Sequence, residues 1–417
     1  MPNLKRSAVF GLCLLVTSAQ AQSDFFAWLS DFRVEAQAKG ISTATLDSTL
    51  GNARPAPQVL ALDTSQPEFV STFLTYLNRH VSAQKIARGR ALLIEHQALL
   101  ADVEQRYGIP PHILVAFWGM ETNYGSYTGD TPIPAALATL AYDGRRSAFF
   151  RAQLLDALSI IEEGHVRAAD MKGSWAGAMG LMQFMPSTYR RYAVDGDGDG
   201  RINLWTLADA MHSAGNYLNK AGWKRDQPAV LQVRLPADFM WRDARLFNRR
   251  SMQDWKPANV VQASGAPLPD QAWAAAIVLP QGWRGPAFMV FDNFDVIMQW
   301  NRSVSYALSV AILADQLVGS TALPTTGESA PHLSHAQLVH LQQKLTELGF
   351  DTGAADGLAG IKTQSAIRRF QVAHQLPADG YPSAPLLSHV QNAHADAMER
   401  GKLKSPLIAP VFSDPIP

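Results

Sequence analysis

Apolar residues recur at helical spacing through most of the first 220 residues of the chain, as in the stripe that contains Phe25 and Phe32. From about Val230 the pattern changes to short apolar runs bounded by proline and glycine. These runs predict strands, namely Leu-Gln-Val-Arg-Leu, Ala-Ala-Ile-Val-Leu-Pro and Ala-Phe-Met-Val-Phe. A helical pattern returns at 294–317. We therefore predict a mainly α fold with a small β subdomain at about 226–292, an α+β arrangement.

A linker follows the last helical pattern. Residues 319–332 are rich in Pro, Gly, Ser and Thr, a composition typical of the connection between two domains. A compact segment at 333–392 comes next, and residues 393–417 are predicted to form a tail. The sequence thus predicts a large first domain at 22–318 and a separate small helical C-terminal domain.

The most apolar part of the chain ends in a carboxylic acid. Residues 110–120 begin with two prolines, which suit the first turn of a helix, and are apolar almost all round, which predicts a helix buried in a domain. Gly125 is the predicted stop. Because burial disfavours a charged carboxylate, Glu121 at this helix end has the property that a general acid needs. The alternative is a Glu that caps the helix or pairs with an arginine.

The N-terminus and the composition indicate an exported protein. Lys5 and Arg6 precede a short apolar run, and Ala19-Gln-Ala21 matches a signal-peptide cleavage site, so residues 1–21 are predicted to be removed. The only cysteine, Cys13, is removed with them, and no small residue precedes it as in a lipoprotein. The mature chain has 34 basic and 36 acidic side chains, a net charge of −2, and no basic block for nucleic acid. A bacterial periplasm is the predicted location.

An acidic loop is the second chemical signal. Asp195, Asp197 and Asp199 alternate with glycines at the spacing of the first half of an EF-hand calcium loop. The usual Glu at position 12 is absent, so Asp209 would have to close a longer loop, and Arg201 would contribute its backbone carbonyl. Because carboxylates held this close repel one another, we predict a structural Ca²⁺ site. The alternative is a solvated acidic turn.

A glycine-rich segment lies between these two signals, Gly177-Ala-Met-Gly-Leu-Met-Gln183-Phe-Met-Pro-Ser. Its small residues let backbone and ligand approach closely, and Gln183 is a polar group that should have a specific partner. It follows Glu121-Thr-Asn-Tyr-Gly and precedes the acidic loop and Ala-Gly-Asn-Tyr217-Leu. Motifs in this order resemble the membrane-bound lytic transglycosylase B family, whose members cut the glycan strands of peptidoglycan. The resemblance covers about residues 24–318.

The resemblance implies a lysozyme-like catalytic core in the domain at 22–318. It assigns the family's sole catalytic carboxylate to Glu121. The positions that match the family's saccharide cleft are Ser174, Gln183, Tyr217, Asn301 and Tyr306. The calcium loop is a family feature too, and its ligand positions match Asp195, Asp197, Asp199, Asp209 and the carbonyl of Arg201. Other aromatic residues near the motifs either stack on sugars or belong to the core: Trp118, Tyr124 and Trp175.

One acid implies unusual chemistry, because ordinary glycosidases use two carboxylates. Candidates for a second one lack an apolar setting like that of Glu121, and they are Asp130, Asp143, Glu162, Glu163 and Asp170. The resemblance implies that Glu121 first protonates the oxygen between N-acetylmuramic acid (MurNAc) and N-acetylglucosamine (GlcNAc). It then takes the proton of the muramoyl C6 hydroxyl, which gives a 1,6-anhydro product. The alternatives are a hydrolytic muramidase and a non-catalytic peptidoglycan-binding protein.

The segment at 333–392 carries a further resemblance. An amphipathic helix ends at Gly349, Asp-Gly turns follow at 356 and 379, and Ile367 and Phe370 occupy core positions. This pattern is similar to the peptidoglycan-binding type 1 domain, a small helical bundle. On a flexible linker, such a module would raise the local concentration of the enzyme at the wall. Peptidoglycan is the predicted partner, and other cell-wall enzymes are further candidate partners. No organic cofactor is predicted.

Overall fold

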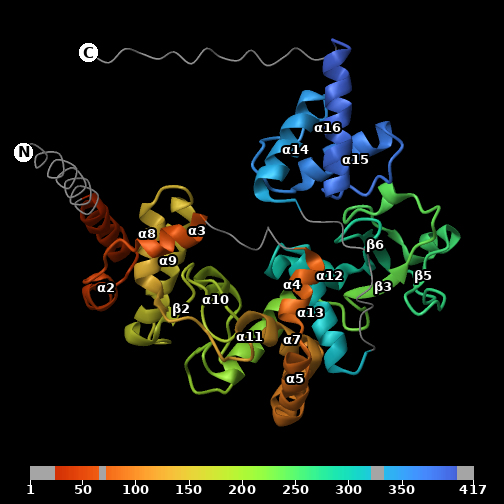
Figure 1. Ribbon diagram of the computed structural model, residues 1–417. Helices are drawn as coiled ribbons and strands as arrows, with labels where there is room; N and C mark the ends of the chain where they lie inside the picture. The colour runs from red at the N-terminus through yellow and green to blue at the C-terminus, as the bar shows by residue number, and fades with distance from the viewer. Residues whose placement is uncertain (1–23, 65–71, 321–332, 402–417) are drawn as a thin grey trace, which may run out of the picture. The chain divides into compact units, whose positions relative to one another are not determined.

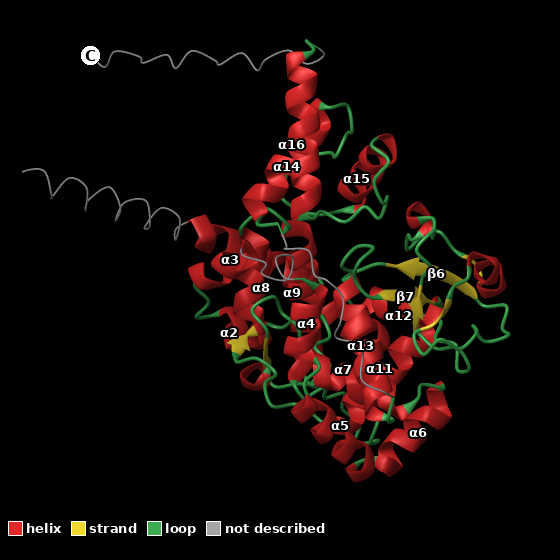
Figure 2. Ribbon diagram, turned by 45° about the vertical axis from the view of Figure 1, so that its right-hand side comes forward, coloured by secondary structure: helices red, strands yellow, loops and turns green. Residues whose placement is uncertain are grey.

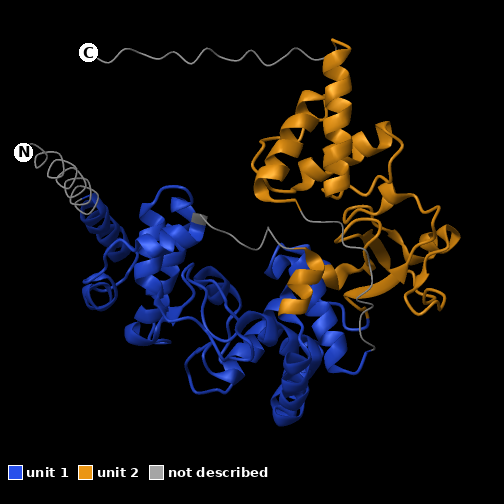
Figure 3. Cartoon of the chain, in the orientation of Figure 1, with its two compact units in different colours: residues 1–66, 80–226, 295–321 blue, residues 67–79, 227–294, 322–417 orange. Residues whose placement is uncertain are grey.

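The computed structural model describes residues 24–64, 72–320 and 333–401. The chain divides into two compact units, the first made of residues 1–66, 80–226 and 295–321 and the second of residues 67–79, 227–294 and 322–417 (Figure 3). Helices dominate and strands are few (Figure 1), which confirms the predicted fold class. Across the described ranges, no helix is long and apolar enough to cross a membrane. The predicted signal peptide lies outside these ranges.

Among the described residues of the first unit, the elements are helices and one antiparallel pair of short strands, β1 (Thr131–Pro132) with β2 (Lys172–Gly173). An unlabelled helix spans 24–38. The further α-helices are α2 (Thr43–Leu50), α3 (Pro57–Thr64), α5 (Ala83–Glu95), α6 (Gln97–Tyr107), α7 (Pro111–Thr122), α8 (Ile133–Tyr142), α9 (Ser147–Glu162), α10 (Pro186–Tyr192), α11 (Leu207–Lys220), the second half of α12 (Asp292–Trp300) and α13 (Val304–Leu317).

Helix α7 lies at the centre of this unit. Its residues from Leu114 to Phe117 are completely buried, and α5, α6 and α13 pack around it. The prediction of a helix that is buried on all sides is confirmed. The predicted stop at Gly125 is wrong, because α7 ends at Thr122 and Asn123 takes the left-handed conformation (φ 49°) as the C-cap.

The last helical pattern of the unit forms two helices where we predicted one. The periodicity at 294–317 predicts an unbroken helix, but α12 ends at Trp300 and α13 begins at Val304. Ser303 caps α13, and its hydroxyl accepts a hydrogen bond from the N–H of Tyr306 at 3.3 Å. A serine N-cap inside the apolar pattern is the sequence signal for this break.

The second unit contains a five-stranded antiparallel sheet in the order β4-β6-β7-β3-β5. Figure 2 shows two of its neighbouring strands, β6 and β7. Its strands are β3 (Val230–Arg234), β4 (Arg250–Ser251), β5 (Val261–Gln262), β6 (Ala274–Val278) and β7 (Ala287–Val290). The three longest strands coincide with the three predicted runs, which confirms that prediction. The subdomain has its own core around Met252, Trp255 and Phe291. Phe73 of α4 (Phe73–His80) packs on Phe288 of β7, with ring centroids 5.7 Å apart.

Three helices form the C-terminal module, α14 (His335–Glu347), α15 (Ile361–Ala373) and α16 (Ala384–Glu399). The module has a separate core in which Ile367 and Phe370 are completely buried, as predicted. Helix α16 continues past residue 392, so the predicted start of the tail is too early. Most of the predicted linker lies outside the described residues. The module contacts the β subdomain directly, because the N–H of Trp283 donates to Asp379 at 2.9 Å.

Candidate active site

Glu121 lies in the last turn of α7, where two aromatic side chains donate hydrogen bonds to one of its carboxyl oxygens. The indole N–H of Trp300 is 3.0 Å from Oε1, and the hydroxyl of Tyr306 donates to the same atom. The carboxyl group is half-buried. The break between α12 and α13 makes this arrangement possible, since Trp300 ends one helix and Tyr306 lies in the first turn of the next. These two bonds fix the orientation of the carboxyl group.

An aromatic cluster surrounds the indole of Trp300. The centroid of its ring lies 4.5 Å from Phe117, 4.9 Å from Tyr217 and 5.2 Å from Phe184. The structure thus brings Tyr217 and Tyr306, both predicted site residues, into one assembly with Glu121. Trp300 was missed at the sequence level, although an indole N–H in an apolar segment needs an acceptor and so gave a usable signal.

The glycine-rich segment is tied to the loop that follows Glu121. Gln183, at φ 49°, donates from Nε2 to the carbonyls of Thr128 (3.1 Å) and Gly180 (2.9 Å). The hydroxyl of Thr122 donates to the Leu181 carbonyl at 2.9 Å. The predicted specific partner of Gln183 is therefore backbone, and its amide holds the two loops together.

Glycine is required at position 180 in this segment. Its φ is +68°, and a Cβ there would lie 2.4 Å from the Leu204 carbonyl oxygen. The side chains of two other predicted site residues accept hydrogen bonds from backbone N–H groups a few positions along the chain. The Ser174 hydroxyl accepts the N–H of Ala178 at 2.9 Å, and the Asn301 side-chain oxygen accepts the N–H of Ser303 at 3.2 Å.

Four of the other five candidate carboxyl groups bind partners away from Glu121, and the fifth is exposed. Glu162 accepts hydrogen bonds from the N–H and the hydroxyl of Ser42, at 3.0 and 2.8 Å. Three more form ion pairs with arginines: Asp143 with Arg145, Glu163 with Arg190, and Asp170 with Arg167. Asp130 is exposed on the surface. The structure agrees with the interpretation of these five carboxyl groups as surface groups.

Two of the aromatic residues considered for sugar stacking belong to the packing of α5 against α7. The Tyr124 hydroxyl donates to the Lys85 carbonyl at 2.9 Å, and the ring fills the space beside Gly119. Trp118 is 6% exposed and packs edge-on against Tyr124. Trp118 thus belongs to the core, and Tyr124 is half-buried between the two helices.

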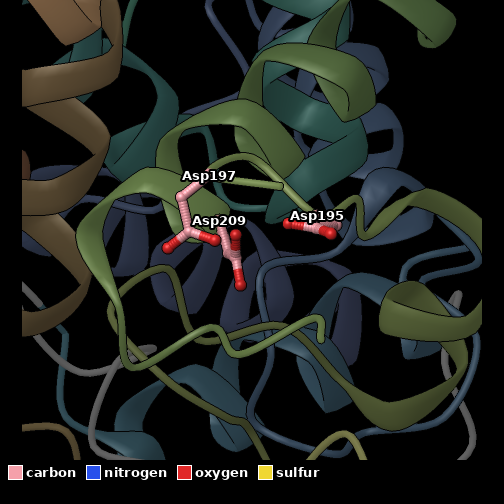
Figure 4. Close-up of side chains that lie close together, drawn as sticks. All are labelled: Asp195, Asp197 and Asp209. Carbon is pink, nitrogen blue, oxygen red and sulfur yellow. The ribbon is translucent and has the colours of Figure 1, made fainter. Parts of the chain in front are cut away.

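The acidic loop folds back on the first turn of α11. Carboxylate oxygens of Asp195, Asp197 and Asp209 all lie within 4.8 Å of one another (Figure 4). Asp209 is 1% exposed, and this burial raises its pKa. Hydrogen bonds from the N–H groups of Asn203 and Gly196 lower the pKa in part, and the charges of Asp197 and Asp195 raise it further. Asp199 is not part of this group, and its carboxylate accepts the N–H of Arg201 at 2.7 Å.

This donor set fits a hard divalent cation. Three carboxylates supply the oxygen ligands that Ca²⁺ prefers, and the ion would cancel the repulsion that raises the pKa of Asp209. A cation would also link the loop to α11. The extension of the loop to Asp209, predicted from spacing alone, agrees with this geometry.

A half-buried carboxyl group at the end of a core helix, oriented by two aromatic donors, is an arrangement suited to a general acid for a glycosidic bond. Residues 24–315 match the transglycosylase SLT domain family, and residues 334–388 match the putative peptidoglycan binding domain. The chain therefore belongs to the transglycosylase SLT family, and it is a lytic transglycosylase by class of enzyme. The resemblance seen in the motifs is confirmed.

Similar proteins of known name are lytic transglycosylases as well. Over 286 residues the chain is 32% identical to the membrane-bound lytic murein transglycosylase B of Escherichia coli strain K12, covering 65% of this chain and 77% of the relative. SltB3 from Pseudomonas aeruginosa, in complex with NAG-anhNAM-pentapeptide, is 42% identical with a TM-score of 0.85, covering 88% of this chain and 99% of that one. Escherichia coli Slt35 in complex with calcium is 29% identical with a TM-score of 0.59, covering 70% and 92%.

Proposed function

We propose that the protein is a lytic murein transglycosylase that cleaves the MurNAc-GlcNAc β-1,4 bond of peptidoglycan without water, with Glu121 as its only catalytic carboxylate. The observation that carries this proposal is the pair of hydrogen bonds from Trp300 and Tyr306 to Oε1 of Glu121, since the other candidate carboxyl groups bind other partners or, in the case of Asp130, are exposed. The complexes of SltB3 with NAG-anhNAM-pentapeptide and NAG-NAM-pentapeptide support the choice of substrate.

The reaction begins with a proton transfer from Glu121 to the bridging oxygen. The bond between that oxygen and C1 of MurNAc breaks, GlcNAc leaves as an alcohol, and the acetamido oxygen of MurNAc bonds to C1. Glu121, now a carboxylate, removes the proton of the C6 hydroxyl, and O6 forms a bond to C1 as the acetamido oxygen leaves. Protons and bonds balance over the two steps, and Glu121 ends as it began, protonated.

The residues around Glu121 would bind the saccharide and hold the acid in place. Tyr306 and Trp300 orient the carboxyl group. Gln183 keeps the glycine-rich segment against the loop after Glu121, so that backbone lies close to the bound glycan. The other residues that we assign to the saccharide site are Ser174, Tyr217 and Asn301.

Release of soluble muropeptides from purified sacculi tests whether the chain is an enzyme on this substrate. The mature protein is expected to solubilise sacculi catalytically, with many turnovers per molecule, whereas heat-denatured protein releases nothing. A protein that co-sediments with sacculi but releases no muropeptide would be a non-catalytic binding protein, and our proposal would fail.

Calcium is the proposed structural ion of the acidic loop, held by Asp195, Asp197 and Asp209, with Asp199 and the carbonyl of Arg201 as further ligands. The calcium complex of Slt35 supports this choice. A cation that binds only the folded state at about 100 times its Kd stabilises by about 2.7 kcal/mol. We therefore expect chelation to lower the melting temperature by about 5–10 °C in a domain of this size.

The matched variants make the calcium test specific. In Asp197→Asn, chelation is expected to have little further effect, because a ligand is already lost. In Asp130→Asn, an exposed acid outside the loop, the full drop should remain. A melting curve of the wild-type protein that is the same in excess calcium and in chelator would leave the loop as an acidic turn.

Export to the periplasm is proposed from the predicted signal peptide, and the cell-wall enzymes among the relatives support it. Cleavage after Ala21 would leave Gln22 as the first residue, without Cys13 and therefore without a lipid anchor at that residue. Mass spectrometry of the protein from a periplasmic extract should give a chain that begins at Gln22. A chain that keeps Met1, or one with a lipid on Cys13, would contradict this.

A further inference from the structure

Side chains of the C-terminal module and of the β subdomain meet within the second unit. The N–H of Trp283 donates to Asp379 of the module, and Nη2 of Arg368 donates to the Ala244 carbonyl at 3.4 Å. Gly282 lies so close to the module that a Cβ would be 2.8 Å from Oδ2 of Asp379. The module is therefore seated on the β subdomain, which differs from the predicted picture of a freely tethered module.

Basic and aromatic side chains gather at this contact, and we call them the junction cluster: Trp241, Arg245, Trp283, Arg284 and Arg368. The rings of Trp241 and Trp283 are 5.6 Å apart, and the Arg284 guanidinium lies 4.8 Å from the Trp283 ring. Trp283 is 38% exposed, although it lies where two domains meet. Exposed aromatic rings beside arginines are typical of binding sites.

Arg368 lies near one carboxylate, that of Asp379, and near one other guanidinium, that of Arg245. Asp379 already accepts N–H groups of Gln371, Tyr381 and Trp283. Burial lowers the pKa of Arg368, and the positive charge of Arg245 lowers it further. The negative charge of Asp379 raises this pKa in part. Nε of Arg368 is buried and has no hydrogen-bond partner among the described residues. A buried donor without an acceptor, next to a second guanidinium, is costly unless an anion binds there.

We propose that the junction cluster binds a carboxylate of the stem peptides of peptidoglycan. The planar guanidinium groups of Arg245 and Arg368 match a carboxylate in shape and charge, and Trp283 offers an apolar surface for the adjoining side chain. The source of the anion follows from the match of residues 334–388 to a peptidoglycan binding domain, and to this extent the inference rests on the proposed function. The site would let the enzyme distinguish peptide-bearing strands from bare glycan.

Binding of the free stem pentapeptide tests this inference without any glycan for the active site. Isothermal titration of the mature chain would use the pentapeptide and the same peptide with its carboxyl groups amidated. We expect the acid form to bind and the amide form to bind at least tenfold more weakly. Arg245→Gln is expected to weaken binding of the acid form about tenfold. Trp283→Ala, which keeps the backbone N–H that bonds Asp379, should weaken both forms.

Arg400→Gln is the matched control, because it removes the same charge from an exposed position at the end of α16. The Arg400→Gln variant should bind the peptide as the wild type does. Because Arg245 is also exposed, the melting curves of the Arg245→Gln and Arg400→Gln variants should both match the wild type. Equal binding of the acid and amide forms, or equal losses in the two arginine variants, would overturn the inference. A chain that binds the peptide but cleaves no sacculi would contradict the proposed function alone.

Discussion

Glu121→Gln is expected to reduce the rate of muropeptide release at least a thousandfold. The amide keeps the size of the side chain and an oxygen that accepts the hydrogen bonds of Trp300 and Tyr306, but it has no proton to give. General acid–base catalysis contributes about 10²–10⁴ in rate for one proton transfer, and here a single residue serves two transfers. The measurement is the initial rate of release from sacculi, followed by liquid chromatography.

The control for this variant is Glu95→Gln, which changes another glutamate at the end of a helix. Glu95 is the last residue of α5, is exposed, and lies 3.7 Å from Arg88 in a surface ion pair. It should keep full activity, and both variants should melt within about 2 °C of the wild type, as expected of surface or isosteric changes. A Glu121→Gln protein that retains a tenth of the wild-type rate would remove Glu121 from the catalytic role.

Tyr306→Phe is expected to lower kcat about 10–100-fold with a smaller change in KM. The Tyr306 side chain is 4% exposed and bonds Glu121 through its hydroxyl, so phenylalanine keeps the packing and removes only the donor. A hydrogen bond to a charged group contributes about 1.5–3 kcal/mol, which corresponds to this range of rates. Trp300→Phe removes the second donor to Oε1 and should behave in the same way.

A double variant separates positioning of the acid from a general loss of fold. If Tyr306 acts through Glu121, adding Tyr306→Phe to Glu121→Gln should cause almost no further loss of rate. Tyr189→Phe is the control for a buried tyrosine hydroxyl, since it donates to the Ile202 carbonyl at 2.7 Å. This variant should lower the melting temperature and leave kcat unchanged. A Tyr306→Phe enzyme with wild-type kcat would show that the hydroxyl does not position the acid.

Local patterns predict well where a single segment decides its own structure. The all-apolar run before Glu121 became the central helix α7, and the three short apolar runs became β3, β6 and β7. Ile367 and Phe370 were found in the core of the module for the same reason. In each case burial on all sides, or along a short strand, is encoded in residues next to one another in the chain.

Contacts between distant segments were less accessible to prediction. Trp300 lies 179 positions from Glu121, and only the break after α12 directs it to the carboxyl group. Apolar spacing hid that break, because Ser303 interrupts the pattern without ending its periodicity. The contact of Trp283 with Asp379 joins two domains, and neither residue carries a local signal for it. Such features depend on tertiary packing, which sequence spacing describes only in part.

The product of the reaction tests the central claim, that Glu121 serves as acid and then as base without water. Sacculi would be digested by the wild-type protein in water enriched in heavy oxygen, and the released muropeptides analysed by mass spectrometry. We predict 1,6-anhydromuramoyl ends, lighter than reducing ends by one water molecule, with no heavy oxygen incorporated. Reducing MurNAc ends that carry one heavy oxygen atom would contradict this account and identify the enzyme as a hydrolytic muramidase.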